Sequence, residues 1–231
     1  MVMDTARTTL DAVRKLKPAR LPALPGAASL RELLVGGLDA ILNVGLFVGI
    51  ALGFGVWSSW AMVERGSALT TRTSGAWVLW PNAGRPDADP YTRAHFARLG
   101  SLPLSSTAFY AWEARSDDEG QKLHSSCEYA LQGEGFAGDW WSIAVFDEKG
   151  VLITNSAGRH AYNASTIALG TDGSYIVTLA RDARPGNWLP TGGAGRLVLV
   201  MQRSAPRPNA TPAEMDAAAR GLPAIRRIAC R

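Results

Sequence analysis

The sequence has few of the residues from which most metal and catalytic sites are built. Among its 231 residues there are two cysteines and three histidines, and 19% of the residues are charged. The histidines (His95, His124 and His160) have no spacing that would place two of them on one helix face. Two cysteines alone are too few ligands for zinc. We therefore predict no metal site and no cofactor, and we expect each histidine to be an ordinary surface or half-buried residue.

The chain also lacks the short motifs of nucleotide-binding proteins and serine hydrolases. The glycine-rich stretch TGGAGR (residues 191–196) has no following Lys-Ser/Thr and leads into a predicted strand. A phosphate loop instead leads into a helix, whose N–H groups hold the anion. No G-x-S-x-G nucleophile elbow is present either. We name no catalytic residue, and a hydrolase is only a minor alternative.

The small net charge of +4 does not indicate a nucleic-acid partner. Its distribution is more informative, because residues 1–37 contain six basic and three acidic side chains, a net charge of +3. Prolines and a glycine interrupt residues 18–26, so we expect residues 1–30 to be a basic cytoplasmic tail. Within it, residues 5–17 could form a short amphipathic helix on the inner leaflet.

One long apolar stretch, AILNVGLFVGIALGFGVW, occupies residues 40–57. About 20 apolar residues span a bilayer as a helix, and Trp57 and Trp60 stand where an interfacial aromatic belt would lie. We predict a transmembrane helix over residues 31–63. The basic flank comes first, which places the N-terminus in the cytoplasm and the main domain in the periplasm of a bacterial inner membrane. A cleaved signal peptide and a buried soluble helix are the alternatives.

Three glycines recur every four residues inside this predicted helix. Gly45, Gly49 and Gly53 share one face, where small side chains let a second helix approach closely. A partner transmembrane helix or a homo-oligomer is therefore a possible partner for the span. The alternative is that glycine is simply common in membrane helices.

Beyond a connector at residues 64–89, the hydrophobic period becomes that of strands. Residues 90–100 form the exception, a helix with Asp89 as N-cap and Gly100 after its end. Thr211 begins a second such helix. We predict strands at 108–114, 126–133, 140–147, 151–155, 174–180 and 196–203. The expected fold is mainly β: an antiparallel β-sandwich or jelly roll over residues 90–231.

Several segments of this domain resemble the bacterial family known as domain of unknown function 1214, in its short membrane-anchored form. The segments are GDWWSIAVFDEKGVLITNSAGRHAYN, DGSYIVTL and RPGNWLPTGGAGRLVLVMQR. The chain departs from the family pattern at Ser156 and His160, where members often have proline and tyrosine. The resemblance covers roughly residues 90–230. It implies a β-sandwich and leaves the function open.

The resemblance also singles out residues. Its short form, with a tail ending in cysteine, suggests that Cys127 and Cys230 pair in a disulfide, with two free thiols as the alternative. Five family positions are candidate ligand contacts: Asp147, Asn155, Arg159, Asn187 and Trp188. Asp147, Asn155 and Arg159 could equally form a salt bridge or hold the loop around one hairpin in place. Trp188 either plugs the end of the core or lines a cleft.

These observations favour a non-catalytic binding or assembly module, anchored in the membrane at the cell envelope. The alternative is a small-ligand or carbohydrate-binding sandwich, because eight tryptophans are present and several lie near predicted loops.

Overall fold

The structure, a computed structural model, describes residues 27–136, 139–205 and 210–231. Nearly all of the expected cytoplasmic tail, including the expected helix at 5–17, lies outside these residues. The chain divides into two units, residues 1–57 and residues 58–231.

The described part of the first unit belongs to one long helix, α2 (Ala27–Arg65). It is 39 residues long, and every side chain from residue 34 to residue 57 is exposed. The stretch Leu34–Arg65 has a mean hydropathy of 2.0 and is long and apolar enough to cross a membrane. At about 1.5 Å per residue it exceeds the ~30 Å hydrocarbon core of a bilayer.

The second unit contains the last two turns of α2, two short helices and ten strands. The helices are α3 (Pro90–Leu99) and α4 (Pro212–Ala219), capped by Asp89 and Thr211 as the sequence predicted. The strands are β1 (Arg72–Ser74), β2 (Trp77–Leu79), β3 (Phe109–Ala114), β4 (Cys127–Glu134), β5 (Trp141–Asp147), β6 (Ala161–Asn163), β7 (Ser174–Ala180), β8 (Asn187–Pro190), β9 (Leu197–Ser204) and β10 (Ala224–Cys230).

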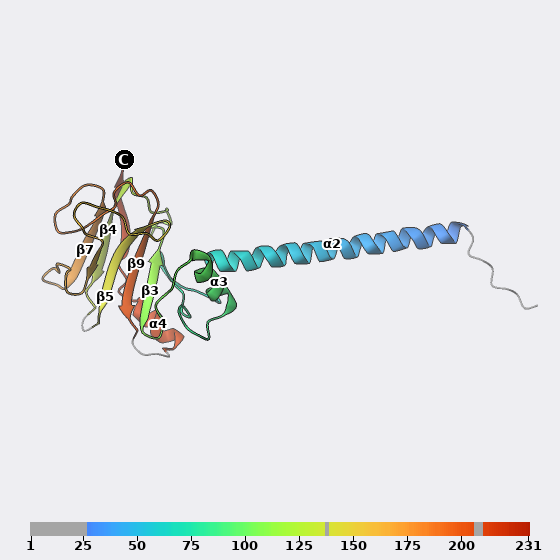
Figure 1. The fold of residues 1–231 in the computed structure, drawn as a ribbon, viewed down its shortest axis with the longest axis horizontal. Helices are drawn as coiled ribbons and strands as arrows, with labels where there is room; N and C mark the ends of the chain where they lie inside the picture. The colour runs from blue at the N-terminus through green and yellow to red at the C-terminus, as the bar shows by residue number, and fades with distance from the viewer. Residues whose placement is uncertain (1–26, 137–138, 206–209) are drawn as a thin grey trace, which may run out of the picture. The chain divides into compact units, whose positions relative to one another are not determined.

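The strands form two sheets that share one core (Figure 1). The six-stranded sheet has the order β1-β2-β3-β9-β5-β6, and the four-stranded sheet has the order β10-β4-β7-β8. Alternate residues of β3 and β5 face inward, so β5 buries Trp141, Ile143 and Val145. The Trp141 ring stacks on Tyr175 of β7 with 5.1 Å between centroids, which joins the two sheets. The architecture is therefore mainly β and sandwich-like, as predicted.

Four details differ from the expected fold. The sheets are not wholly antiparallel, because β7 and β8 pair in parallel. Residues 151–155 form no strand and keep only an isolated bridge between Phe146 and Leu152. The expected connector contributes β1 and β2, and β2 pairs with β3. The C-terminal tail forms β10, which pairs with β4. These strands are short or rich in arginine, so an alternating apolar pattern does not identify them.

Candidate functional site

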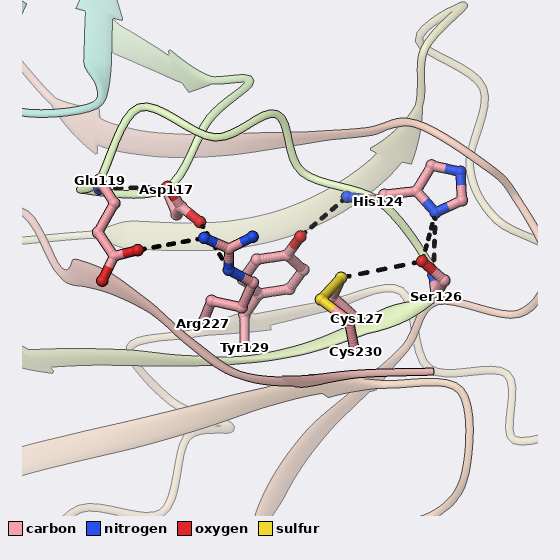
Figure 2. The surroundings of a disulfide bond; sticks show 8 residues. All are labelled: Asp117, Glu119, His124, Ser126, Cys127, Tyr129, Arg227 and Cys230. Atoms are coloured by element: carbon pink, nitrogen blue, oxygen red, sulfur yellow. Dashed lines mark hydrogen bonds and ion pairs between the residues drawn. A yellow bond between two sulfur atoms is a disulfide. The ribbon is translucent and has the colours of Figure 1, made fainter.

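Two polar clusters at the loops of the β domain contain most of the candidate residues. The first surrounds the two cysteines. Cys127 of β4 and Cys230 of β10 are directly paired in the sheet and joined by a disulfide. Figure 2 shows this bond beside two further contacts of the same region. The backbone N–H of His124 donates to the Tyr129 hydroxyl at 3.0 Å, and Arg227 pairs with Glu119 at 3.1 Å.

Burial raises the pKa of the Tyr129 hydroxyl, so this group stays protonated and available for hydrogen bonding. Arg227 also lies 3.4 Å from the carboxylate of Asp117, which is almost fully buried. Together with the disulfide, these contacts hold the C-terminal strand β10 against the loop that follows β3. The disulfide and its neighbours therefore have a clear structural role.

A pocket of about 200 Å³ lies beside the disulfide. Its lining includes both cysteines and five charged side chains: Glu128, Arg181, Asp182, Arg184 and Arg231. Arg184 donates two hydrogen bonds to the Glu128 carboxylate, at 2.9 and 2.7 Å, and this bonding holds the pKa of that carboxyl below its usual value. Arg231 pairs with Asp182. The fifth charge, Arg181, donates through Nε to the backbone oxygen of Gly192 at 2.8 Å.

The second cluster brings together three of the predicted site residues. Asn155 accepts from the Arg159 backbone N–H at 3.0 Å and donates to the Arg159 carbonyl at 2.9 Å. The Arg159 guanidinium lies 5.8 Å from the ring centroid of Tyr162 and 6.0 Å from that of Trp188. The Trp188 backbone N–H donates to the Tyr162 hydroxyl at 3.0 Å. The exposed Arg159 side chain therefore lies near one buried ring, Tyr162, and one half-buried ring, Trp188.

Trp188 is held in place by its side chain as well as by its backbone. Its indole N–H donates to the carbonyl of Ala180 at 3.0 Å, and the side chain is half-buried. The ring therefore stabilises the β7–β8 end of the sheet and also offers a partly exposed face. Its role as a ligand contact stays a prediction.

The other two candidates make structural bonds elsewhere. Asp147 accepts from the backbone N–H groups of Lys149 and Val151, at 2.9 and 2.8 Å, and thereby closes its own hairpin. Asn187 is 8% exposed, and its amide bonds both backbone groups of Ala168 at 2.8 Å. The structure thus brings Asn155, Arg159 and Trp188 together and leaves these two apart.

Sequence reasoning missed Tyr162 and the charged residues of the pocket. Tyr162 lies three residues after Arg159, and arginines 181 and 184 directly precede the NWLP signature, so a basic and aromatic pattern was present there. Among the residues that the structure describes, no group of three His, Cys, Asp or Glu side chains could hold a metal ion.

The fold is that of a sandwich-like β domain following an apolar helix, and comparison with known proteins finds a family match inside that domain. Residues 107–208 match the model of the family described as protein of unknown function (DUF1214), which supports the resemblance seen in the sequence. No curated protein matches the chain.

Two solved structures are similar at low sequence identity. The VPA0106 protein from Vibrio parahaemolyticus is 20% identical with a TM-score of 0.48, over 62% of this chain and 36% of its own. A putative uncharacterized protein from Burkholderia cenocepacia is 18% identical with a TM-score of 0.34, over 55% of this chain and 31% of its own. The chain thus spans about a third of the length of each.

Proposed function

We propose that the protein is a binding module of the bacterial cell envelope, anchored in the inner membrane by α2, with its β domain in the periplasm. The observation that carries this proposal is the helix itself. An apolar surface as long as Leu34–Arg65 with no buried side chain needs a cover, and a bilayer supplies one. A helix of this length reaches through the hydrocarbon core and into both headgroup layers.

Contacts within the second unit favour a retained anchor over a cleaved signal sequence. The carbonyl of Val63, near the end of α2, lies 2.7 Å from Nδ1 of His95 on α3. Arg98, also on α3, pairs with Glu64 and lies 4.7 Å from the ring centroid of Trp60. The folded domain therefore uses the last turns of the helix, and cleavage in or after the span would remove these partners.

Charge and redox chemistry support the orientation. Arg31 and the basic residues before it precede the span, and basic flanks stay in the cytoplasm. A disulfide forms and persists in an oxidising compartment such as the periplasm. Both arguments support a β domain outside the cytoplasm.

The test of anchoring uses full-length protein in bacterial cells, with an epitope tag at each end. We expect the protein to stay in membranes after carbonate extraction and to keep its full mass. In spheroplasts, added protease should destroy the C-terminal tag and spare the N-terminal one. Release by carbonate, a shorter mature mass, or protection of the C-terminal tag would each contradict the proposal.

The binding role is proposed for the second cluster, with an envelope glycan as the class of ligand. The partly exposed Trp188 ring beside the exposed Arg159 guanidinium suits a sugar ring that carries a carboxylate, because the sugar stacks on the indole and the acid pairs with the cation. Calorimetric titration of the protein with acidic and neutral oligosaccharides tests this role. We expect binding of an acidic sugar that Arg159→Ala abolishes and that Arg93→Ala, an exposed control on α3, leaves unchanged. Equal binding by both variants would rule out this cluster.

Assembly through α2 is a second candidate role. No heavy atom lies within 4 Å of the position that a Cβ would take at Gly45, Gly49 or Gly53, so this face of the helix is open. Small residues at this spacing allow close helix approach in a bilayer. The partner would be another transmembrane helix or a second copy of this chain.

A further inference from the structure

We infer that the β domain contacts the membrane surface directly, through a group of exposed leucines beside the end of α2. This inference rests on the proposed anchoring. The juxtamembrane leucines are Leu69, Leu99, Leu102 and Leu104, with exposed fractions of 87%, 48%, 99% and 53%. Leu102 and Leu69 are the two most exposed large apolar side chains in the described part of the chain.

The leucines belong to three segments next to the exit of the span. Leu69 lies four residues after α2 ends, in a turn closed by the N–H groups of Thr70 and Thr71 donating to the Ser67 carbonyl, at 2.9 and 2.8 Å. Leu99 is the last residue of α3, and the other two leucines occupy the loop that follows.

A series of contacts connects the loop that follows α3 to the end of α2. His95, on α3, bonds the Val63 carbonyl of α2 and stacks on Trp80 with 4.1 Å between ring centroids. The segment after Trp80 in turn meets the leucine loop, because the Ser106 N–H donates to the Ala83 carbonyl at 2.9 Å. The leucines are therefore positioned by the same residues that hold the last turn of the span.

Gly84 shows how closely the segment after Trp80 packs against the loop that follows α3. Gly84 has φ 65°, and a Cβ there would lie 2.8 Å from the backbone oxygens of Pro103 and Leu104. Backbone contact of this kind leaves the loop little freedom to fold its leucines inward. Exposed apolar side chains that gather in one region of a surface, unlike single scattered ones, indicate an interaction site.

The bilayer surface is the partner that this position favours. Because Leu34–Arg65 is longer than the hydrocarbon core, the last turns of α2 extend into the headgroup layer, and the domain begins there. Exposed Arg65 on α2 and exposed Arg93 on α3 add cations near the leucines. Apolar side chains together with basic ones are the composition of surfaces that lie in a membrane interface.

Site-directed spin labelling of the full-length protein in phosphatidylcholine–phosphatidylglycerol vesicles tests the inference. The two native cysteines are bonded to each other, so an introduced cysteine is the single free thiol. Labels are placed by Leu69→Cys and Leu102→Cys. Leu169→Cys, in the loop between β6 and β7, is the control because Leu169 is an exposed leucine outside the juxtamembrane group. Leu46→Cys reports on the span.

We expect the labels at 69 and 102 to collide several-fold more often with oxygen, relative to a water-soluble nickel complex, than the label at 169 does. Values equal to those at 169, with a lipid-like value at 46, would overturn the inference and leave the anchor standing. A water-accessible label at 46 would instead overturn the anchor. Spin–spin broadening at 102 that disappears on dilution with unlabelled protein would show a second copy covering the leucines, which also overturns the inference.

Discussion

At the scale of single residues, several polar side chains beside turns form hydrogen bonds with nearby backbone groups. Asp147, Asn155 and Asn187 all looked like candidate ligand contacts, and each satisfies backbone groups of its own neighbourhood. A short amide or carboxylate side chain can bond either a nearby backbone group or a ligand. The sequence alone therefore does not distinguish a residue that closes a loop from one that contacts a ligand. The Arg159 side chain is exposed, and its role as a ligand contact stays a prediction.

The disulfide is the residue-scale contact with the largest expected effect on stability. It closes a loop with a sequence separation of 103 residues, for which the chain-entropy model gives about 4–5 kcal/mol, with observed values nearer 2–4. Replacing both cysteines by serine should lower the free energy of unfolding by roughly that lower range. Urea unfolding in mild detergent measures the change. Ser126→Ala, which leaves the bond intact, is the control, and an unchanged urea midpoint in the double variant would contradict the expectation.

The Glu128–Arg184 pair should make stability depend on acidity. Hydrogen bonding to Arg184, followed by its positive charge, lowers the pKa of Glu128 below its ordinary 4.5. A lowered folded-state pKa adds stability that is fully present above the unfolded pKa and is lost as the pH falls through the folded one. We expect Glu128→Gln to lessen the fall in melting temperature between about pH 5 and about pH 2. Parallel thermal melts of the variant and the wild type measure this, and identical pH profiles would show that the pair contributes nothing.

At the scale of elements, the sequence predicted the strands and helices that have a clear local pattern of their own. The period-two stretches predicted β3, β4, β5, β7 and β9, and the cap residues located α3 and α4. Elements that depend on tertiary pairing were missed. Strand β10 reads AIRRIAC and has five exposed residues in a row, so only its pairing with β4 makes it a strand. The parallel pairing of β7 with β8 likewise follows from the long-range packing of the NWLP segment.

The helix α2 supports a prediction about assembly. If its glycine face packs on a partner helix, Gly49→Leu should prevent close approach and reduce the crosslinked species in native membranes several-fold. The variant should still insert, because leucine is apolar. Phe47→Leu, an exposed change on the face opposite the glycines, is the matched control. A crosslinking pattern that Gly49→Leu leaves unaltered would mean that these glycines have no partner.

At the scale of the whole molecule, the family match covers only part of the folding unit. It spans residues 107–208, whereas the second structural unit spans 58–231. The strands outside the match complete both sheets: β1 and β2 extend one, and β10 extends the other. The disulfide and the contacts of α3 with α2 also involve residues beyond the match. The folding unit is therefore larger than the family domain.

This organisation predicts that the end of α2 belongs to the domain energetically. A fragment of residues 58–231 keeps the contacts of Trp60, Val63 and Glu64 with α3, and a fragment of residues 66–231 loses them. One hydrogen bond, one exposed cation–π contact and one surface ion pair together contribute about 1–3 kcal/mol. We expect the shorter fragment to be destabilised by that amount in urea unfolding. Within the longer fragment, Arg98→Ala should reproduce part of the loss, and Arg93→Ala should not. Equal midpoints for the two fragments would show that the helix is only tethered to the domain. A difference would mean that the last two turns of α2 are part of the folded domain.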